Sequence, residues 1–276
     1  QQVRHQLRRN RPAQFSLFVL FIFVVAALCA GLSPYDPDRM ALGARTLPPD
    51  AAHWFGTDEY GRDYFTRALY GGQISLMVGF LAMLFSTLIG TVVGTVSGYF
   101  GGWLDNLMMR AVDILMAIPA FFLLLVVNAY LKPGVDNIIL IISLLTWMNM
   151  SRLVRAETLS VKEREYVLYA RASGEHPLRI IVRHIIPGVL PTIIVAATLN
   201  IASAILMEST LSFLGLGVQA PAASWGSMLN NAQSYIGEAS WLAMFPGILI
   251  LLTVFSFNVL GDVFRTAFEP GANRDE

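Results

Sequence analysis

An acidic cluster beside a histidine is the first group of residues in this chain that could do chemistry. Asp58, Glu59 and Asp63 lie close to His53 and Arg62, and carboxylate and imidazole groups can bind a cation when their spacing brings them together. The spacing of His53, Asp58 and Asp63 matches none of the familiar metal-binding motifs. We therefore interpret the acids as solvated residues of turns and predict no metal site.

Residues for catalysis or nucleotide binding do not occur at the spacings that those functions need. All histidines lie outside the long apolar runs: His5, His53, His176 and His184. No GxSxG elbow is present, which argues against an intramembrane hydrolase. Lys132 precedes Pro133 and Lys162 precedes Glu163, and neither lysine follows a glycine, so there is no Walker A loop. Cys29 is the only cysteine, which excludes an internal disulfide. We predict no catalytic residue and no cofactor bound by this chain.

Polar side chains inside apolar runs are candidates for a path through a membrane, because they are costly in lipid and usually functional. We assign Asn200, Met207 and Glu208 to a candidate cargo path. Glu208 is expected near the outer end of its helix, facing an aqueous cavity. Asp113 has a duller explanation, because Arg110 lies three residues away on the same helix face.

The composition indicates that lipid surrounds this chain. Hydrophobic residues make up 55% of the 276 residues and charged residues 14%, against about 25% in soluble domains, and the mean hydropathy is +0.57. Uncharged runs long enough to cross a bilayer predict an all-α membrane protein with about six spanning helices, at 15–32, 74–96, 108–131, 137–153, 191–210 and 242–264. The fourth is short, so either Arg152 snorkels or protein encloses the helix.

Cations set the expected orientation, because cytoplasmic loops accumulate Lys and Arg. They gather before the first helix and between the fourth and fifth helices: Arg4, Arg8, Arg9, Arg11, Arg152, Arg155, Lys162, Arg164, Arg171, Arg179 and Arg183. Both termini are therefore expected in the cytoplasm. A cleaved signal is the alternative for the first helix. The expected parts are a cytoplasmic basic tail (1–14), a first spanning helix (15–32), an extracytoplasmic cap (33–72), a transmembrane domain (73–266) with a cytoplasmic loop (154–188), and a cytoplasmic tail (267–276).

Gly90, Gly94 and Gly98 recur every four residues and so share one face of the second expected helix. In lipid, small residues let two helix backbones approach closely. We interpret this face as a packing surface within the chain, with a subunit interface as the alternative. The window 209–237 is also uncharged, but it is rich in glycine and polar residues, so we interpret it as an extracytoplasmic or re-entrant connection.

The basic segment between the fourth and fifth helices has the pattern of two short helices joined by a glycine elbow. Ser160 can cap a helix over 160–172, and Gly174 stops it. Pro177 suits the first position of a second helix, which Pro187 ends before the fifth span. Such a hairpin could carry movement from a cytosolic partner into the bundle. The structural alternative is a plain connector held by anionic lipid.

This segment resembles the cytoplasmic coupling loop of binding-protein-dependent ABC importer permeases. The pattern of that loop runs EAA, three residues, Gly, and then Pro after a spacer. Ala170, Gly174 and Pro187 fall at matching places, whereas Leu168 and Tyr169 occupy the Glu and first Ala positions.

The resemblance covers nearly the whole chain. An ordered set of stretches is similar to the smaller permease subunit of the dipeptide, oligopeptide and nickel importer group: FGTDEYGRD (55–63), GYFGGWLDNLMMRAVDILMAIP (98–119), LSFLGLG (211–217), SWG (224–226) and FNVLGDVFRTAFEP (257–270).

The resemblance implies a type I importer permease fold in the inner or plasma membrane. It implies a complex of two permease subunits, two ATPases that hold ATP and Mg, and an external binding protein, with lipid but no nucleic acid as a further partner. Peptides are the expected cargo, with nickel, a metal chelate or glutathione as alternatives. A channel or secondary transporter that needs no ATPase is the alternative class, which the long basic hairpin disfavours.

The resemblance also implies a set of residues that transmit ATPase motion. Glu165, one turn before the motif, could substitute for the missing motif carboxylate. The full expected set is Glu165, Tyr166, Tyr169, Ala170, Arg171, Gly174, Pro177 and Pro187.

Overall fold

The computed structural model of the chain describes residues 6–7, 10–130 and 134–268. Within these residues the regular structure is helical, apart from one isolated bridge between Thr57 and Asp63. The α-helices are α2 (Arg11–Leu28), α3 (Tyr64–Phe100), α4 (Gly102–Ala117), α5 (Ala120–Tyr130), α6 (Val135–Val161), α7 (Glu165–Ala172), α8 (Pro177–Ile180), α9 (Ile186–Phe213), α10 (Trp225–Ala232) and α11 (Trp241–Phe268). A π-helix, η3 (Ile181–Ile185), joins α8 to α9, and short 3-10 turns are η1 (Ala30–Leu32), η2 (Leu42–Ala44) and η4 (Gln233–Tyr235).

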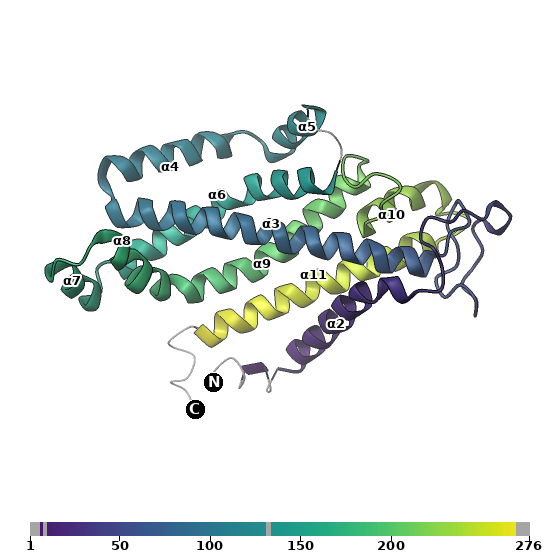
Figure 1. Ribbon diagram of the computed structural model, residues 1–276, viewed down its shortest axis with the longest axis horizontal. Helices are drawn as coiled ribbons and strands as arrows, with labels where there is room; N and C mark the ends of the chain where they lie inside the picture. Colours follow the sequence, from purple (N-terminus) through teal and green to yellow (C-terminus); the bar gives the residue numbers. More distant parts are fainter. Residues whose placement is uncertain (1–5, 8–9, 131–133, 269–276) are drawn as a thin grey trace.

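The long helices lie lengthwise beside one another, and the two ends of this bundle differ (Figure 1). One end carries α7 and α8, and we call it the hairpin end. The other carries α10 and the loops that precede α3, and we call it the cap end. The start of α2 and the end of α11 both lie toward the hairpin end, where Pro12 and Thr266 line one small cavity. Most of the expected tail 267–276 lies outside the described residues.

Five helical segments are long and apolar enough to cross a membrane: Arg11–Leu28, Tyr64–Phe100, Val135–Val161, Pro177–Phe213 and Trp241–Phe268. They confirm five of the expected spans. The fourth expected span proves to be a helix of 27 residues, and 56% of its most apolar window is buried, against 28% for each of the others. α6 is therefore the most buried of the five segments, which favours the expected alternative that protein surrounds this helix.

The third expected span, 108–131, is not one continuous helix. α4 ends at Ala117, and Ile118 is extended, with φ −80° and ψ 122°. Pro119 follows, and a proline disfavours the helical conformation of the residue before it. The chain then continues in α5, so the return pass along the bundle is made by two helices (Figure 1). Hydropathy did not reveal this break, because Ile118 and Pro119 carry no charge.

The glycine face of α3 packs against α6 within the chain. A Cβ on Gly90 would lie 2.6 Å from Met150 Cβ, and one on Gly94 would lie 2.6 Å from the Ser151 carbonyl oxygen. A Cβ on Gly98 would lie 2.8 Å from Thr158 Cβ. All three glycines are buried. The two helices therefore approach as closely as backbone atoms permit, over more than two turns.

Ion pairs attach α4 to the rest of the bundle. Asp105 accepts hydrogen bonds from Arg155 Nε and Nη2, each at 2.6 Å, and one from Ser97 Oγ. Asp113 pairs with Arg152 of α6 rather than with Arg110, so the expected pairing within its own helix is wrong. The long side chain of Arg152 reaches Asp113 from α6, so Asp113 pairs across two helices and not with Arg110 in its own helix. α4 is thus held to α6 at two points of opposite charge.

We expect the Asp105 pair to stabilise the fold in a pH-dependent way. The hydrogen bonds from Arg155 hold the pKa of Asp105 below its ordinary value, so the stabilisation is present at neutral pH. It is lost as the pH falls below the unfolded pKa of about 3.9. Asp105→Asn should lower the free energy of unfolding by about 1 kcal/mol at neutral pH, because the pair is partly exposed. Unfolding temperatures of the two proteins should converge in acid, whereas a constant difference would mean that the substitution acts through packing.

The acids of the cap are buried, which corrects the expectation that they are solvated turn residues. Asp58 is 1% exposed and its Oδ2 lies 2.6 Å from Arg62 Nε and 3.6 Å from Arg67 Nε. Asp63 caps α3 by accepting from the Thr66 backbone N–H at 2.7 Å. Burial raises the pKa of Glu59. The cluster is a structural core for the loops, because charges removed from water must be paired.

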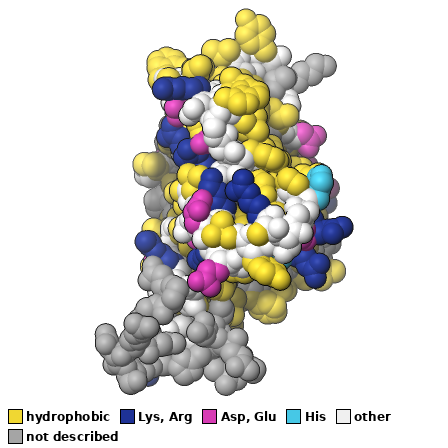
Figure 2. Space-filling model, turned by 90° about the vertical axis from the view of Figure 1, so that its left-hand side faces the viewer, with side chains coloured by type: hydrophobic (Ala, Val, Ile, Leu, Met, Phe, Trp, Pro, Cys, Tyr) yellow, Lys and Arg dark blue, Asp and Glu magenta, His cyan; other side chains and the backbone are white. Residues whose placement is uncertain are grey.

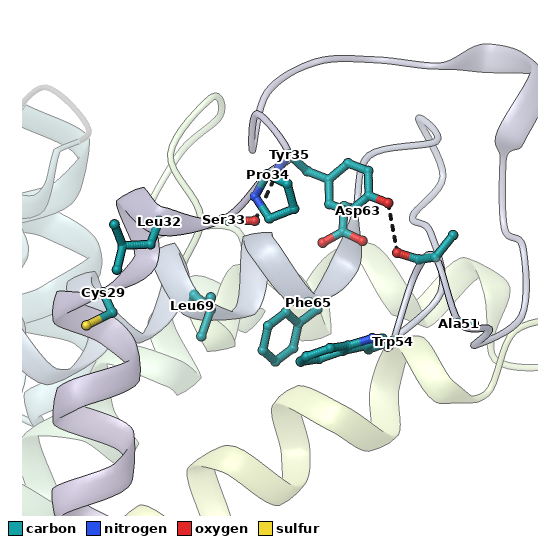
Figure 3. A pocket seen from close by; sticks show the side chains of 11 residues that line it. Cys29, Leu32, Ser33, Pro34, Tyr35, Ala51, Trp54, Asp63, Phe65 and Leu69 are labelled. Atoms are coloured by element: carbon teal, nitrogen blue, oxygen red, sulfur yellow. Dashed lines mark hydrogen bonds between the residues drawn. The ribbon is translucent and has the colours of Figure 1, made fainter.

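A cavity of about 440 Å³ lies where the cap meets the ends of α2 and α3 (Figure 3). Trp54 and Phe65 form one side and Cys29 and Leu32 the other. Tyr35 Oη donates to the Ala52 carbonyl at 2.9 Å and so closes the loop above the cavity. The expected cap is therefore a folded structure seated on the first turns of α3.

Candidate functional site

The candidate site is the basic hairpin at the hairpin end of the bundle, residues 162–185, which contains α7, α8 and η3. Its first helix begins later than expected. Ser160 lies inside α6, which continues to Val161, and α7 begins at Glu165 after an extended Arg164 with φ −70° and ψ 144°. A serine can cap only where the backbone before the helix is extended. No breaker precedes Ser160, so the spanning helix runs through it.

The inner face of the hairpin is fixed to the bundle by a cluster of buried side chains: Val154, Val161, Val167, Ala170, Ile180, Ile185 and Val189. Gly188 allows the closest approach, because a Cβ there would lie 2.9 Å from Val161 Cγ1 and 3.1 Å from Tyr166 Oη. Ala170, which matches the final alanine of the motif, points into this cluster and not outward. It can therefore contribute to coupling only through packing.

The outer face of the hairpin presents aromatic and basic side chains together. Tyr169 is 76% exposed, Tyr166 and Leu178 are also exposed, and Arg171 is exposed in the last turn of the same helix as the two tyrosines. Figure 2 shows this end face on, with Lys and Arg side chains next to apolar ones. Glu165 is exposed in the first turn of α7, where its charge suits the helix N-terminus. Such a mixed surface is typical of protein interfaces rather than of lipid contact.

Gly174 forms the expected elbow. Its φ of +77° lies in the left-handed region, and its N–H bonds to the Arg171 carbonyl while the Glu175 N–H bonds to the Ala170 carbonyl. These bonds end α7 in the manner of a glycine C-cap. Glu175 then accepts from His184 Nε2 at 3.0 Å and so ties the elbow back to η3. Sequence reasoning missed this pair, because its members are nine residues apart on different turns.

Pro177 stands at the first turn of α8 after His176, as expected. Pro187, however, does not end the second helix, which corrects the expected break. The chain passes from α8 through the π-helix Ile181–Ile185 directly into α9. Pro187 stands in the first turn of α9, directly after the π turn, where its missing N–H costs least, so no loop separates the two helices. The hairpin is therefore continuous with α9 and is not joined to it by a loop.

A further contact links the hairpin to α3. Lys162 Nζ donates to the Gly98 carbonyl at 2.9 Å. Because Gly98 also packs on Thr158, the end of α3 and the start of the hairpin are held together at two points. The sequence offered no signal for this bond, since any lysine near a helix end could bind water instead.

The candidate cargo-path residues do not converge on a cavity. Glu208 is 0% exposed and accepts from Ser75 Oγ at 3.0 Å and Ser212 Oγ at 2.7 Å. Glu208 therefore does not face an aqueous cavity, because it is enclosed between α3 and the end of α9. Met207 packs against the buried cluster of α3 and α6, and Asn200 is half-buried on α9.

The serines around Glu208 extend its network to the cap end. Ser75 Oγ accepts from the Trp225 N–H at 3.2 Å, and Ser212 Oγ accepts from the Val218 N–H at 3.1 Å. The carboxyl group thus connects α3, α9, the loop after α9 and the start of α10. The window 209–237 is accordingly a folded connection around this carboxyl group.

Comparison with known proteins is consistent with this geometry. Residues 86–274 match the family model of the binding-protein-dependent transport system inner membrane component. Residues 1–49 match the N-terminal TM domain of oligopeptide transport permease C. The first match includes α6, the hairpin and α9, and the second includes α2 with the start of the cap.

Relatives of known name are similar over nearly the whole chain. The dipeptide transport system permease protein DppC of Bacillus subtilis is 43% identical over 98% of this chain and 85% of the relative. The oligopeptide permease OppC of Bacillus subtilis is 38% identical over 96% and 87%, and the glutathione permease GsiD of Shigella flexneri is 42% identical over 95% and 87%. With its described helices, its hairpin and these matches, this chain belongs to the family of inner-membrane components of binding-protein-dependent transport systems.

Proposed function

We propose that this chain is one of two permease subunits of an ABC importer for peptides, and that its hairpin receives the motion of a cytoplasmic ATPase. The observation that carries the proposal is the exposed aromatic surface around Tyr169 on a basic hairpin whose second helix, α8, runs through η3 directly into α9. Glu165, Tyr166 and Arg171 would contact the ATPase, while Ala170, Gly174, Pro177 and Pro187 would keep the hairpin in shape. ATP and Mg would be held by that partner, and this chain would do no catalysis.

The hairpin end is assigned to the cytoplasm. The cations that gather there support this orientation, because Lys and Arg accumulate on the cytoplasmic side. The start of α2 and the end of α11 both lie toward the hairpin end, so both termini of the chain would be cytoplasmic. The cap end would then face the external binding protein that delivers cargo.

Peptides are the proposed cargo because the named relatives include dipeptide and oligopeptide permeases. Glutathione is the second candidate, since GsiD is as similar as those relatives and glutathione is itself a small zwitterionic peptide. Both candidates can be compared in one experiment. The chain should be purified with its partner subunits, reconstituted in vesicles with the binding protein, and supplied with ATP and labelled cargo. Uptake by this chain alone, or uptake without ATP, would contradict the proposal.

Gly174 provides a direct test of the hairpin's role. We expect Gly174→Val to reduce ATP-driven uptake about tenfold, because the left-handed backbone costs a residue with a Cβ about 1–2 kcal/mol. Apart from the two adjoining residues, no atom of the described residues lies within 4 Å of the Cβ position, so the effect is on the backbone. Gly174→Asn is the matched control, since Asn tolerates this conformation. Uptake and ATP hydrolysis should be measured together, and equal uptake by both variants would rule out a rigid elbow.

A further inference from the structure

A cavity of about 690 Å³ lies at the hairpin end between α6, α9 and the end of α11. One wall is a single stripe of α9, since its members recur at three or four residues: Gly188, Pro191, Thr192, Val195, Ala196 and Leu199. Gly188, Thr192 and Ala196 are small, which leaves space between the helices. The cavity lies several turns closer to the hairpin than Glu208.

Charged side chains of both signs line this cavity. Glu157 comes from α6 and Arg164 from the start of α7, and Arg265 of α11 also lines it. Among the described residues, neither Glu157 nor Arg164 has an ion-pair partner or a side-chain hydrogen bond. Neighbouring charges do have partners, since Arg155 binds Asp105 and Arg152 binds Asp113, as shown above. Glu157 and Arg164 thus stand apart from the charges that hold the fold together.

Glu157 and Arg164 have opposite charges, so a ligand that pairs with both of them must carry both charges. An ammonium group complements Glu157, a carboxylate complements Arg164, and the Thr192 hydroxyl and the apolar wall remain for the part between them. An anionic lipid headgroup would meet the carboxylate of Glu157, and a simple cation would meet the guanidinium of Arg164. A small zwitterionic peptide avoids both repulsions, because its ammonium group can lie beside Glu157 and its carboxylate beside Arg164.

We propose that this cavity is the chain's half of an exit site for cargo, in which Glu157 binds the ammonium group and Arg164 the carboxylate of a peptide. The inference rests on the proposed function of peptide import. It replaces the buried Glu208 with residues that a ligand can reach. The cavity is also joined to the hairpin, because Gly188 lines it and packs against Tyr166 and Val161. A displacement of the hairpin therefore changes the wall that holds the peptide.

Uptake by the reconstituted complex is the first test. Glu157→Gln and Arg164→Gln should each reduce uptake of a free dipeptide about tenfold, the loss expected for one hydrogen bond to a charged group. ATP hydrolysis by the complex should be unchanged. Glu238→Gln and Arg110→Gln are matched controls, because both side chains are exposed, neither lines the cavity and neither belongs to the hairpin. Uptake by the cavity variants equal to that of the controls would overturn the exit site.

Thiol protection is the second test, and it does not depend on transport. Cys29→Ser removes the only native thiol, and Thr192→Cys places a new one in the cavity of the assembled complex. Dialanine should slow labelling of this thiol, whereas N-acetyl-dialanine amide should not, and Glu157→Gln should abolish the protection. Val182→Cys, exposed on the hairpin, is the control and should be unaffected.

The two tests separate the exit site from the function on which it rests. Equal protection by the blocked peptide, or none by either peptide, overturns the exit site even if the complex imports peptides. A wild-type complex that hydrolyses ATP but takes up no peptide contradicts the proposed function, whatever the labelling shows.

Discussion

Gly94→Leu is expected to prevent this chain from folding into a stable bundle. A Cβ at Gly94 already lies 2.6 Å from the Ser151 carbonyl oxygen and 2.8 Å from Val154 Cβ. The nearest atom belongs to the backbone of α6, so it cannot move aside as a flexible side chain would. Overpacking of a close contact costs about 1–3 kcal/mol or more, and a leucine adds several atoms to it. The amount of monodisperse chain extracted from membranes should fall to a small fraction of the wild-type amount.

Gly247→Leu is the matched control for this experiment. Gly247 also lies within a long helix, α11, but outside the backbone of that helix no atom of the described part of the chain lies within 4 Å of its Cβ position. The same substitution there should leave the yield of folded chain unchanged. Equal loss at both positions would indicate a general intolerance of leucine for glycine. No loss at Gly94 would show that α3 and α6 can separate without consequence.

Glu208→Leu should destabilise the cap end and leave cargo preference unchanged. Ser75 and Ser212 each accept a backbone N–H and donate to Glu208, so removal of the carboxyl group leaves both hydroxyl protons without acceptors. Each buried unsatisfied group costs about 1–3 kcal/mol, and the unfolding temperature of the purified complex should fall by many degrees. Glu208→Gln should have a smaller effect, because its amide oxygen replaces one acceptor.

The informative measurement is the comparison of stability with preference between peptides. Glu238 is exposed, so Glu238→Leu should change neither property. A Glu208→Gln variant with wild-type stability and an altered order of preferred peptides would instead restore Glu208 to the cargo path. Stability that falls without a change of preference assigns Glu208 to the structure of the cap end.

Most long helices could be predicted from the sequence, because lipid demands uninterrupted apolar runs and internally bonded backbone. The packing role of Gly90, Gly94 and Gly98 was equally predictable, since glycines spaced four residues apart in a membrane helix typically mark a close helix–helix contact. The break at Pro119 was also present in the sequence. It was missed because the charge-free run through 108–131 was judged by length and hydropathy alone.

Contacts between distant segments could not be predicted. Glu208 meets Ser75, which lies 133 residues away, and Arg152 meets Asp113 across two helices. A sequence shows that a glutamate is placed in an apolar run, but not which hydroxyl groups surround it. Local rules also failed where the neighbouring helix overrode them. Ser160 lies inside α6 and does not cap a new helix. Pro187 follows a π turn and lies in α9, where a break was expected.

The length of α3 has a consequence for how the hairpin end and the cap end of the bundle are connected. Its 37 residues extend about 55 Å, well beyond a hydrocarbon core of about 30 Å. Arg67 ties its first turns to the cap, and the Gly98 carbonyl near its last turn binds Lys162. α9 and α11 contain Pro191 and Pro246, whereas α3 contains no proline. A displacement of α3 along its axis would therefore move its attachment to the cap and its attachment to the hairpin together.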